Sequence, residues 1–183
     1  MLFRSTTPAL PDLIHLDAMP GKRDVRPPAL TLLQAYGELV ENHPEYLSRY
    51  FAVLDQLERA DSGNPLVQAA LGSRELHAGQ YTEAAAHLQH AIDGGVDKTT
   101  VYTDLTEAVL KLNETSEAVT VLEKAAELDP FNASLRKQLV VQLIQVKDYA
   151  NAKKEMEDYV RRFPADQFMR DMLRRAQAIG EPK

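Results

Sequence analysis

The chain has 183 residues, of which 44% are hydrophobic and 26% charged, a composition typical of one globular domain. It contains no apolar run near the roughly 18 residues that a membrane-spanning helix needs. Its first twenty residues lack the apolar core of a secretory signal, so we expect a cytoplasmic protein without membrane insertion. If the chain is a fragment of a longer secreted protein, we expect it in the periplasm or outside the cell.

The absence of cysteine excludes several chemistries within these residues. Disulfides, thiolate metal sites, cysteine nucleophiles and thioether-attached haem all need a cysteine, and the chain has none.

Charge is distributed unevenly along the chain, whose net charge is −6. Residues 65–130 carry 4 Lys or Arg against 11 Asp or Glu, a net charge of −7. Residues 131–183 carry 11 against 7, a net charge of +4. Such an asymmetry either orients a charged partner or reflects two solvated faces that differ without functional consequence.

The first 28 residues differ in composition from the rest, because they hold half of the ten prolines. Proline removes a backbone donor and biases its predecessor away from helix, so residues 1–28 are predicted to form an extended arm or linker. From residue 29, apolar residues recur at a spacing of three to four. This pattern predicts a helical pair over residues 29–62. Asn64 and Pro65 then have the chemistry of an N-cap and a first helical residue.

A repeat with a period of 34 residues follows. It relates the pairs Leu71-Gly72, Leu105-Thr106 and Leu139-Val140. The same step relates the turn residues Gly79, Asn113 and Lys147, and the small residues Ala84, Ala118 and Ala152. These positions resemble the tetratricopeptide repeat (TPR) family, whose unit is a hairpin of two helices.

The resemblance implies an all-α fold, a right-handed solenoid of helical hairpins. Three repeats would cover residues 65–98, 99–132 and 133–166. Residues 29–62 would form a degenerate N-terminal hairpin, and residues 167–180 a capping helix. Each helix is too short to be stable alone, so the hairpins must stack.

The resemblance also implies a function, because partners of TPR-like arrays bind in a concave groove lined by the first helix of each hairpin. We therefore expect a protein-binding scaffold rather than an enzyme, with no cofactor. The candidate groove residues are Ala69, Ser73, Leu76, Thr103, Asp104, Glu107, Lys137, Gln138, Val141 and Gln145.

One subgroup of the family clamps the terminal carboxylate of chaperone tails with Lys and Asn side chains. Here Ala69 and Ser73 stand where the first Lys and Asn are expected, and Lys137 alone does not restore the clamp. Asp104 and Glu107 would repel a carboxylate. The expected partner is therefore a protein or peptide of neutral to basic charge.

The sequence predicts no metal, nucleotide or nucleic-acid site. His87 and His90 lie one helical turn apart, with Asp93 and His77 nearby, but a metal site needs more ligands, and none is predicted. No phosphate-binding glycine loop or nucleophile elbow occurs. The C-terminal arginines are interleaved with acids, so nucleic acid is not an expected partner.

Two alternatives stay open. The chain is also consistent with the C-terminal helical regulatory or assembly region of a larger enzyme. A multihaem cytochrome is one such case, because Leu33–Leu39 resembles the junction before TPR-like repeats in some of these proteins. Self-assembly through an exposed hairpin face is the other alternative, and the sequence does not fix the oligomeric state.

Overall fold

The computed structural model describes residues 28–40 and 42–179. Within them the chain forms nine α-helices and one short 3-10 helix, and no strand, which confirms the all-α prediction. The N-terminal helices are α1 (Pro28–Val40), η2 (Pro44–Tyr46) and α2 (Leu47–Ala60). The rest are α3 (Pro65–His77), α4 (Tyr81–Asp93), α5 (Thr99–Lys111), α6 (Thr115–Leu128), α7 (Ala133–Gln145), α8 (Tyr149–Arg162) and α9 (Gln167–Ile179). The predicted arm lies outside the described residues, apart from Pro28, which begins α1.

The chain divides into two compact units, and the boundary between Val53 and Leu54 falls inside α2. In the first unit α1 packs against η2. Leu30, Leu33 and Tyr36 are buried, and the ring of Tyr36 lies 6.1 Å from that of Tyr46, measured between centroids.

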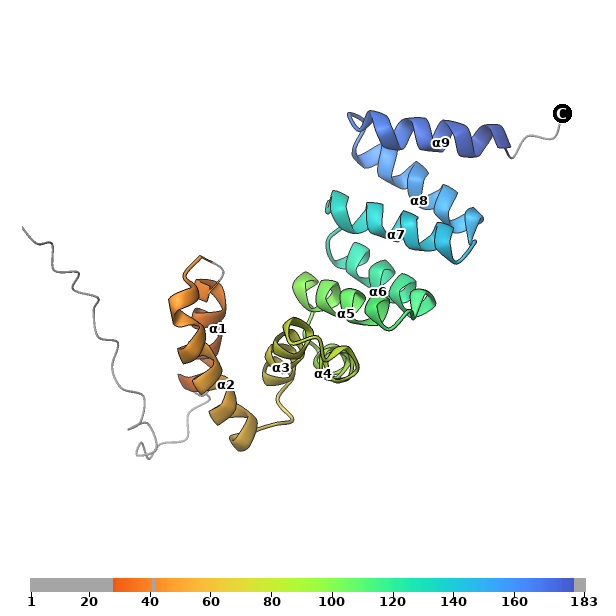
Figure 1. The fold of residues 1–183 in the computed structure, drawn as a ribbon. Helices are drawn as coiled ribbons and strands as arrows, with labels where there is room; N and C mark the ends of the chain where they lie inside the picture. Colours follow the sequence, from red (N-terminus) through yellow and green to blue (C-terminus); the bar gives the residue numbers. More distant parts are fainter. Residues whose placement is uncertain (1–27, 41, 180–183) are drawn as a thin grey trace, which may run out of the picture. The chain divides into compact units, whose positions relative to one another are not determined.

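In the second unit, which begins at Leu54, the helices from α3 to α9 form a stack in which each contacts the next (Figure 1). The pairs α3–α4, α5–α6 and α7–α8 are antiparallel hairpins, and α9 is a single helix packed on α8 (Figure 1). The first helices α3 and α5 also contact each other directly. The predicted solenoid of helical hairpins is confirmed.

The first helices begin at residues that keep the 34-residue phase. Asn64 accepts a hydrogen bond from the Leu66 amide (3.1 Å), and Asn132 accepts one from the Leu135 amide (3.2 Å). These side chains cap amides that have no partner within the helix. Asp166, one step further, accepts from the Met169 amide (3.0 Å) and so caps α9.

Small residues allow the two helices of a hairpin to approach closely. A Cβ added to Gly72 would lie 2.5 Å from Cγ of Leu88 on α4, well inside van der Waals contact. Ala84 and Ala118 are fully buried, and Leu105 and Leu122 fill the core between hairpins.

Among the described residues of this stack, Arg136 is the buried charged side chain, and each nitrogen of its guanidinium group donates a hydrogen bond. Arg136 on α7 is 6% exposed, a burial that carries a large desolvation penalty unless the charge is paired. Its guanidinium pairs with Glu155 on α8, and its Nε donates to the Pro130 carbonyl at 2.8 Å. Arg136 thereby ties the α6–α7 turn to both helices of the third hairpin.

The last helix combines a buried side with a strongly charged one. Met169 is 2% exposed, and Met172 and Leu173 pack against the core more loosely. Arg174 is 74% exposed and pairs with Asp171 at 3.3 Å. Leu173 and Arg174 continue the phase of Leu139 and Val140, so α9 stands where a further first helix would stand.

Candidate functional site

The candidate groove residues lie on the first helices α3, α5 and α7. Five of them are exposed, namely Thr103, Glu107, Gln138, Val141 and Gln145. Asp104 and Lys137 are half-buried. Ala69 and Ser73 are half-buried, and Leu76 is 8% exposed and belongs to the hydrophobic core. Leu76 therefore contributes almost no surface to a partner.

Two of these helices bring a set of polar groups together. Asp104 on α5 is hydrogen-bonded to Ser73 on α3, and both His77 and Glu107 lie close enough to act on its charge. Desolvation is the largest influence and raises the pKa of Asp104 above its ordinary value, and Glu107 raises it further. The hydrogen bond from Ser73 and the charge of His77 act in the opposite direction. The net effect is a raised pKa, because the interactions with Ser73 and His77 do not fully replace the hydration that the Asp104 carboxylate loses.

Lys137 on α7 is not a free cation. Its Nζ lies 2.7 Å from Oδ2 of Asp166 and 5.6 Å from the centroid of the Tyr159 ring. The Tyr159 hydroxyl donates to the same Asp166 oxygen at 2.8 Å. We call these three residues, Lys137, Tyr159 and Asp166, the α7–α9 joint, because they connect α7, α8 and the start of α9.

The joint shifts the pKa values of its two charged members in the directions that favour the ion pair. The hydrogen bond from Lys137 is the main reason that the pKa of Asp166 falls to about 2, with help from the Met169 amide and Tyr159. The hydrogen bond with Asp166 is likewise the main reason that the pKa of Lys137 is raised. Both groups stay ionised over the physiological range, so the positive charge of Lys137 is compensated from within the chain.

Most of the remaining candidates lie on α7, and one lies on α5. Val141 is 47% exposed on α7, with Gln138 and Gln145 exposed on the same helix. Thr103 is exposed on α5, but its hydroxyl is used locally, because it donates to the Thr99 carbonyl at 2.9 Å.

Sequence reasoning did not find Asp166 and Tyr159, although a signal for Asp166 was present. Asp166 has the same phase as Asn64 and Asn132, both of which cap first helices. The pairing of Lys137 with Asp166 had no such signal, since it depends on how α7, α8 and α9 pack.

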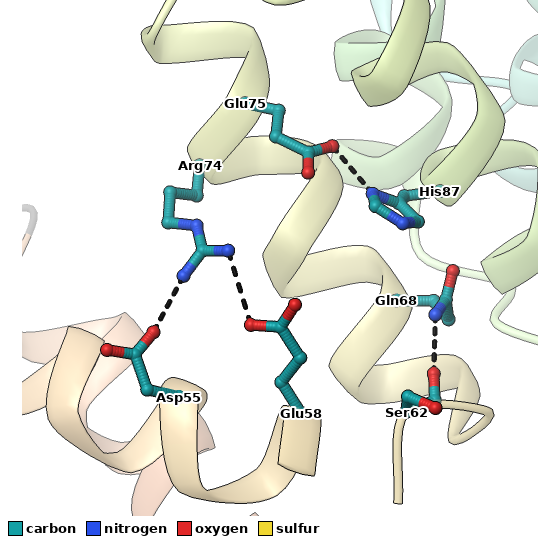
Figure 2. Close-up of polar contacts among 7 residues, drawn as sticks. All are labelled: Asp55, Glu58, Ser62, Gln68, Arg74, Glu75 and His87. Atoms are coloured by element: carbon teal, nitrogen blue, oxygen red, sulfur yellow. Dashed lines mark hydrogen bonds and ion pairs between the residues drawn. The ribbon is translucent and has the colours of Figure 1, made fainter.

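Further polar contacts connect α3 to α2 on one side and to α4 on the other within the second unit, as Figure 2 shows. Arg74 on α3 reaches Asp55 at 2.9 Å and Glu58 at 3.4 Å, both on α2. The neighbouring Glu75 points the other way and meets Nδ1 of His87 on α4 at 2.6 Å (Figure 2). These contacts join neighbouring helices, which is a structural role.

Metal binding and membrane insertion can be examined in the part of the chain that the structure describes. There, no three His, Cys, Asp or Glu side chains are placed so that they could hold a metal ion. His87 is engaged by Glu75. In the same residues, no helix combines the length and the apolar character needed to cross a lipid bilayer.

Comparison with known proteins identifies the class of protein that this fold belongs to. Residues 75–143 match the tetratricopeptide repeat family model, in agreement with the resemblance seen in the sequence. No curated protein sequence matches the chain at significant similarity.

Several solved structures share the fold. The crystal structure of YrrB, described as a TPR protein with an unusual peptide-binding site, is 18% identical with a TM-score of 0.66. The match covers 83% of this chain and 76% of that one. The first TPR of Spaghetti (RPAP3) bound to the HSP90 peptide SRMEEVD is 20% identical, with a TM-score of 0.50 and coverage of 66% and 97%.

One similar structure belongs to an enzyme. The O-GlcNAc transferase of Thermobaculum terrenum is 18% identical with a TM-score of 0.59. The match covers 74% of this chain but only 26% of that protein. At these identities the comparisons establish the shared helical-repeat fold.

Proposed function

We propose that this chain is a protein–protein interaction scaffold, without catalytic activity or a cofactor of its own. A peptide or a segment of a partner domain would bind in the groove lined by α3, α5 and α7. Two of the similar structures support this proposal, since one is described as having a peptide-binding site and another holds a peptide.

The observation that carries the proposal is the charge of the candidate groove. Asp104 and Glu107 present two carboxylates on α5, and Lys137, the one lysine among the candidates, is already paired with Asp166. A cationic side chain that approached Asp104 would restore the electrostatic compensation that burial has removed. The groove is therefore suited to a neutral or basic segment, with a Lys or Arg side chain placed at Asp104 and Glu107.

The same residues argue against an anionic tail. The peptide bound to RPAP3, SRMEEVD, is acidic, and such a ligand needs cationic side chains along the first helices. In this chain Ala69 and Ser73 stand on α3, and acids follow on α5. A terminal carboxylate would meet repulsion rather than a clamp.

The proposal is tested by affinity capture from a lysate of the source cell. The bait is the full chain, and the groove variant is Asp104→Lys/Glu107→Lys. A matched control, Glu83→Lys/Glu123→Lys, makes the same change of charge at exposed positions on the second helices α4 and α6. We expect partners retained by the native chain and the control but lost from the groove variant, and the partner sequences should contain basic segments.

Two results would contradict the proposal. Retention of the same partners by all three proteins would exclude the groove as the binding site. Loss from both double variants would show that net charge, and not the groove, controls binding.

A second candidate function is that these repeats form the helical part of a larger enzyme. The match to a limited part of the O-GlcNAc transferase is the observation that favours it. An antibody raised against the chain would decide the matter by immunoblot of the source cell. A band near 20.5 kDa supports the free scaffold, and a much larger band supports the larger protein.

A further inference from the structure

Two phenylalanine side chains are exposed to solvent in the C-terminal part of the stack. Phe131 is 71% exposed and Phe168 is 69% exposed, whereas most large apolar side chains of the second unit are buried. Neither ring adds to the core, so the fold does not explain their presence. Exposed aromatic rings beside arginines are typical of residues that dominate binding energy at interfaces.

The two rings lie along one edge of the stack. Phe131 is in the turn between α6 and α7, and Phe168 is the second residue of α9, just after the turn from α8. Figure 1 shows both turns on the same side of the stack, opposite the turn between α7 and α8. Arg162, at the end of α8, contacts the first of them, because its guanidinium carbon lies 5.8 Å from the centroid of the Phe131 ring.

This edge is also cationic. Arg161 and Arg162 end α8, and Arg170 lies one turn into α9, all three exposed. Arg161 is partly compensated by Asp158 at 2.9 Å. Among the described residues, Arg162 and Arg170 make no ion pair within 4.0 Å, although Arg170 donates a hydrogen bond to Gln167 at 2.5 Å and Arg162 acts on the charge of Glu155. Arg162 also lies over an aromatic face, a position that favours recognition of charged groups.

We propose that this arginine–phenylalanine edge, defined by Phe131, Arg161, Arg162, Phe168 and Arg170, binds an acidic segment of a partner protein. The carboxylates of the segment would pair with Arg162 and Arg170, which can each hold a carboxylate in bidentate fashion. An apolar side chain between the acids would cover the exposed rings. This surface is separate from the groove proposed above, and the two have opposite charge preference.

A protein segment fits the edge better than a nucleic acid does. Glu127 and Glu157 are exposed close by in the sequence, and the whole chain carries a net charge of −6. A long polyanion would be repelled by these charges and gains most from many cations, whereas only Arg162 and Arg170 of the edge are without an ion pair among the described residues. A short segment with a few acids avoids most of that repulsion.

The test is the fluorescence anisotropy of a short labelled peptide in which pairs of Glu alternate with single Phe or Leu residues. The edge variants are Phe131→Ala, Phe168→Ala and Arg162→Glu in the full chain. Because all three side chains are exposed, we expect no loss of fold, which circular dichroism checks. Tyr149→Ala is the matched aromatic control, since Tyr149 is 62% exposed at the opposite end of α8. Arg59→Glu is the matched charge control, an exposed arginine on α2.

We expect the edge variants to bind the peptide roughly tenfold more weakly and the two controls to bind it like the native chain. Binding should also weaken as salt rises. The groove variant Asp104→Lys/Glu107→Lys should keep its affinity for this peptide, which separates the outcome from that of the proposed groove function.

Three outcomes overturn the proposal. The first is no binding of the acidic peptide by the native chain. The second is equal weakening in the control variants. The third is tighter binding of single-stranded poly(dT) than of the peptide with the same dependence on Arg162, which would make the edge a nucleic-acid surface.

Discussion

The turn inside each of the three hairpins has one residue in a left-handed backbone conformation, and only one of these three residues is glycine. Gly79, Asn113 and Lys147 have φ angles of 77°, 63° and 62°, and each follows the first helix of its hairpin. Glycine adopts this region without steric cost, and asparagine tolerates it better than most residues. Lysine has neither advantage, so the third hairpin carries local strain that the first lacks.

Replacing Lys147 with Gly should therefore stabilise the protein. We expect a gain of about 0.5–1 kcal/mol in the free energy of unfolding, the steric relief less the added entropy of the unfolded glycine. Urea denaturation measures it. Asn113→Gly serves as the comparison and should gain less. A loss of stability in Lys147→Gly would show that the lysine side chain makes a contact worth more than the strain.

At the scale of elements, the helices α7, α8 and α9 are connected by the joint of Lys137, Tyr159 and Asp166. Lys137 and Tyr159 both bind one carboxylate oxygen of Asp166, and the other oxygen of Asp166 caps α9. The attachment of the last helix thus depends on the ionisation of Asp166.

The variant Asp166→Asn isolates that dependence, because asparagine can still accept the cap hydrogen bond. The pKa of Asp166 falls from 3.8 to about 2 on folding, so the carboxylate contributes stability above the unfolded value. This contribution is lost as the pH falls from about 4 towards 2. We expect the native chain to be more stable than Asp166→Asn at neutral pH, and the difference to shrink across this acidic range.

Urea titrations at a series of pH values measure both proteins. A difference that stays constant down to the lowest pH would mean that the charge of Asp166 contributes nothing, and that the variant acts only through its amide.

Much of the element-level structure could be predicted, because the repeat phase carries it. The phase placed the hairpin turns at Gly79, Asn113 and Lys147, and the Asn64 cap followed from local chemistry. The ion pairs between side chains, in contrast, do not recur with the 34-residue repeat, so the sequence did not predict them. Lys137 was expected to face a partner, but its pairing depends on Asp166, which the packing of three helices brings into reach. The repeat did not predict the burial of Arg136 either, because the equivalent positions in the first two repeats are Gln68 and Tyr102, which carry no charge.

At the scale of the whole molecule, the second unit is a stack in which each helix contacts mainly its neighbours in sequence. Stability in such an array is approximately a sum of hairpin and neighbour terms. A change in the middle hairpin therefore acts on both of its interfaces, whereas a change on an exposed face acts on neither.

Ala118 and Glu107 test this division within the second hairpin. Ala118 is fully buried, so Ala118→Leu should wedge the hairpin apart and cost roughly 1–3 kcal/mol by overpacking. Glu107→Gln, at an exposed position, should stay within about 0.5 kcal/mol of the native chain. Hydrogen exchange should show the loss of protection in Ala118→Leu centred on α5 and α6. Equal melting losses in the two variants would contradict the assignment of core and surface.

Arg174 determines whether this array could be lengthened by design. It stands three 34-residue steps after Gly72, the position at which a first helix approaches its hairpin partner most closely. A new helix laid on that side of α9 would have to enclose a guanidinium, with a penalty of several kcal/mol for the buried charge. Exchange of this one arginine for glycine or alanine would turn α9 from a terminus into an acceptor, onto which an engineered module could be grafted.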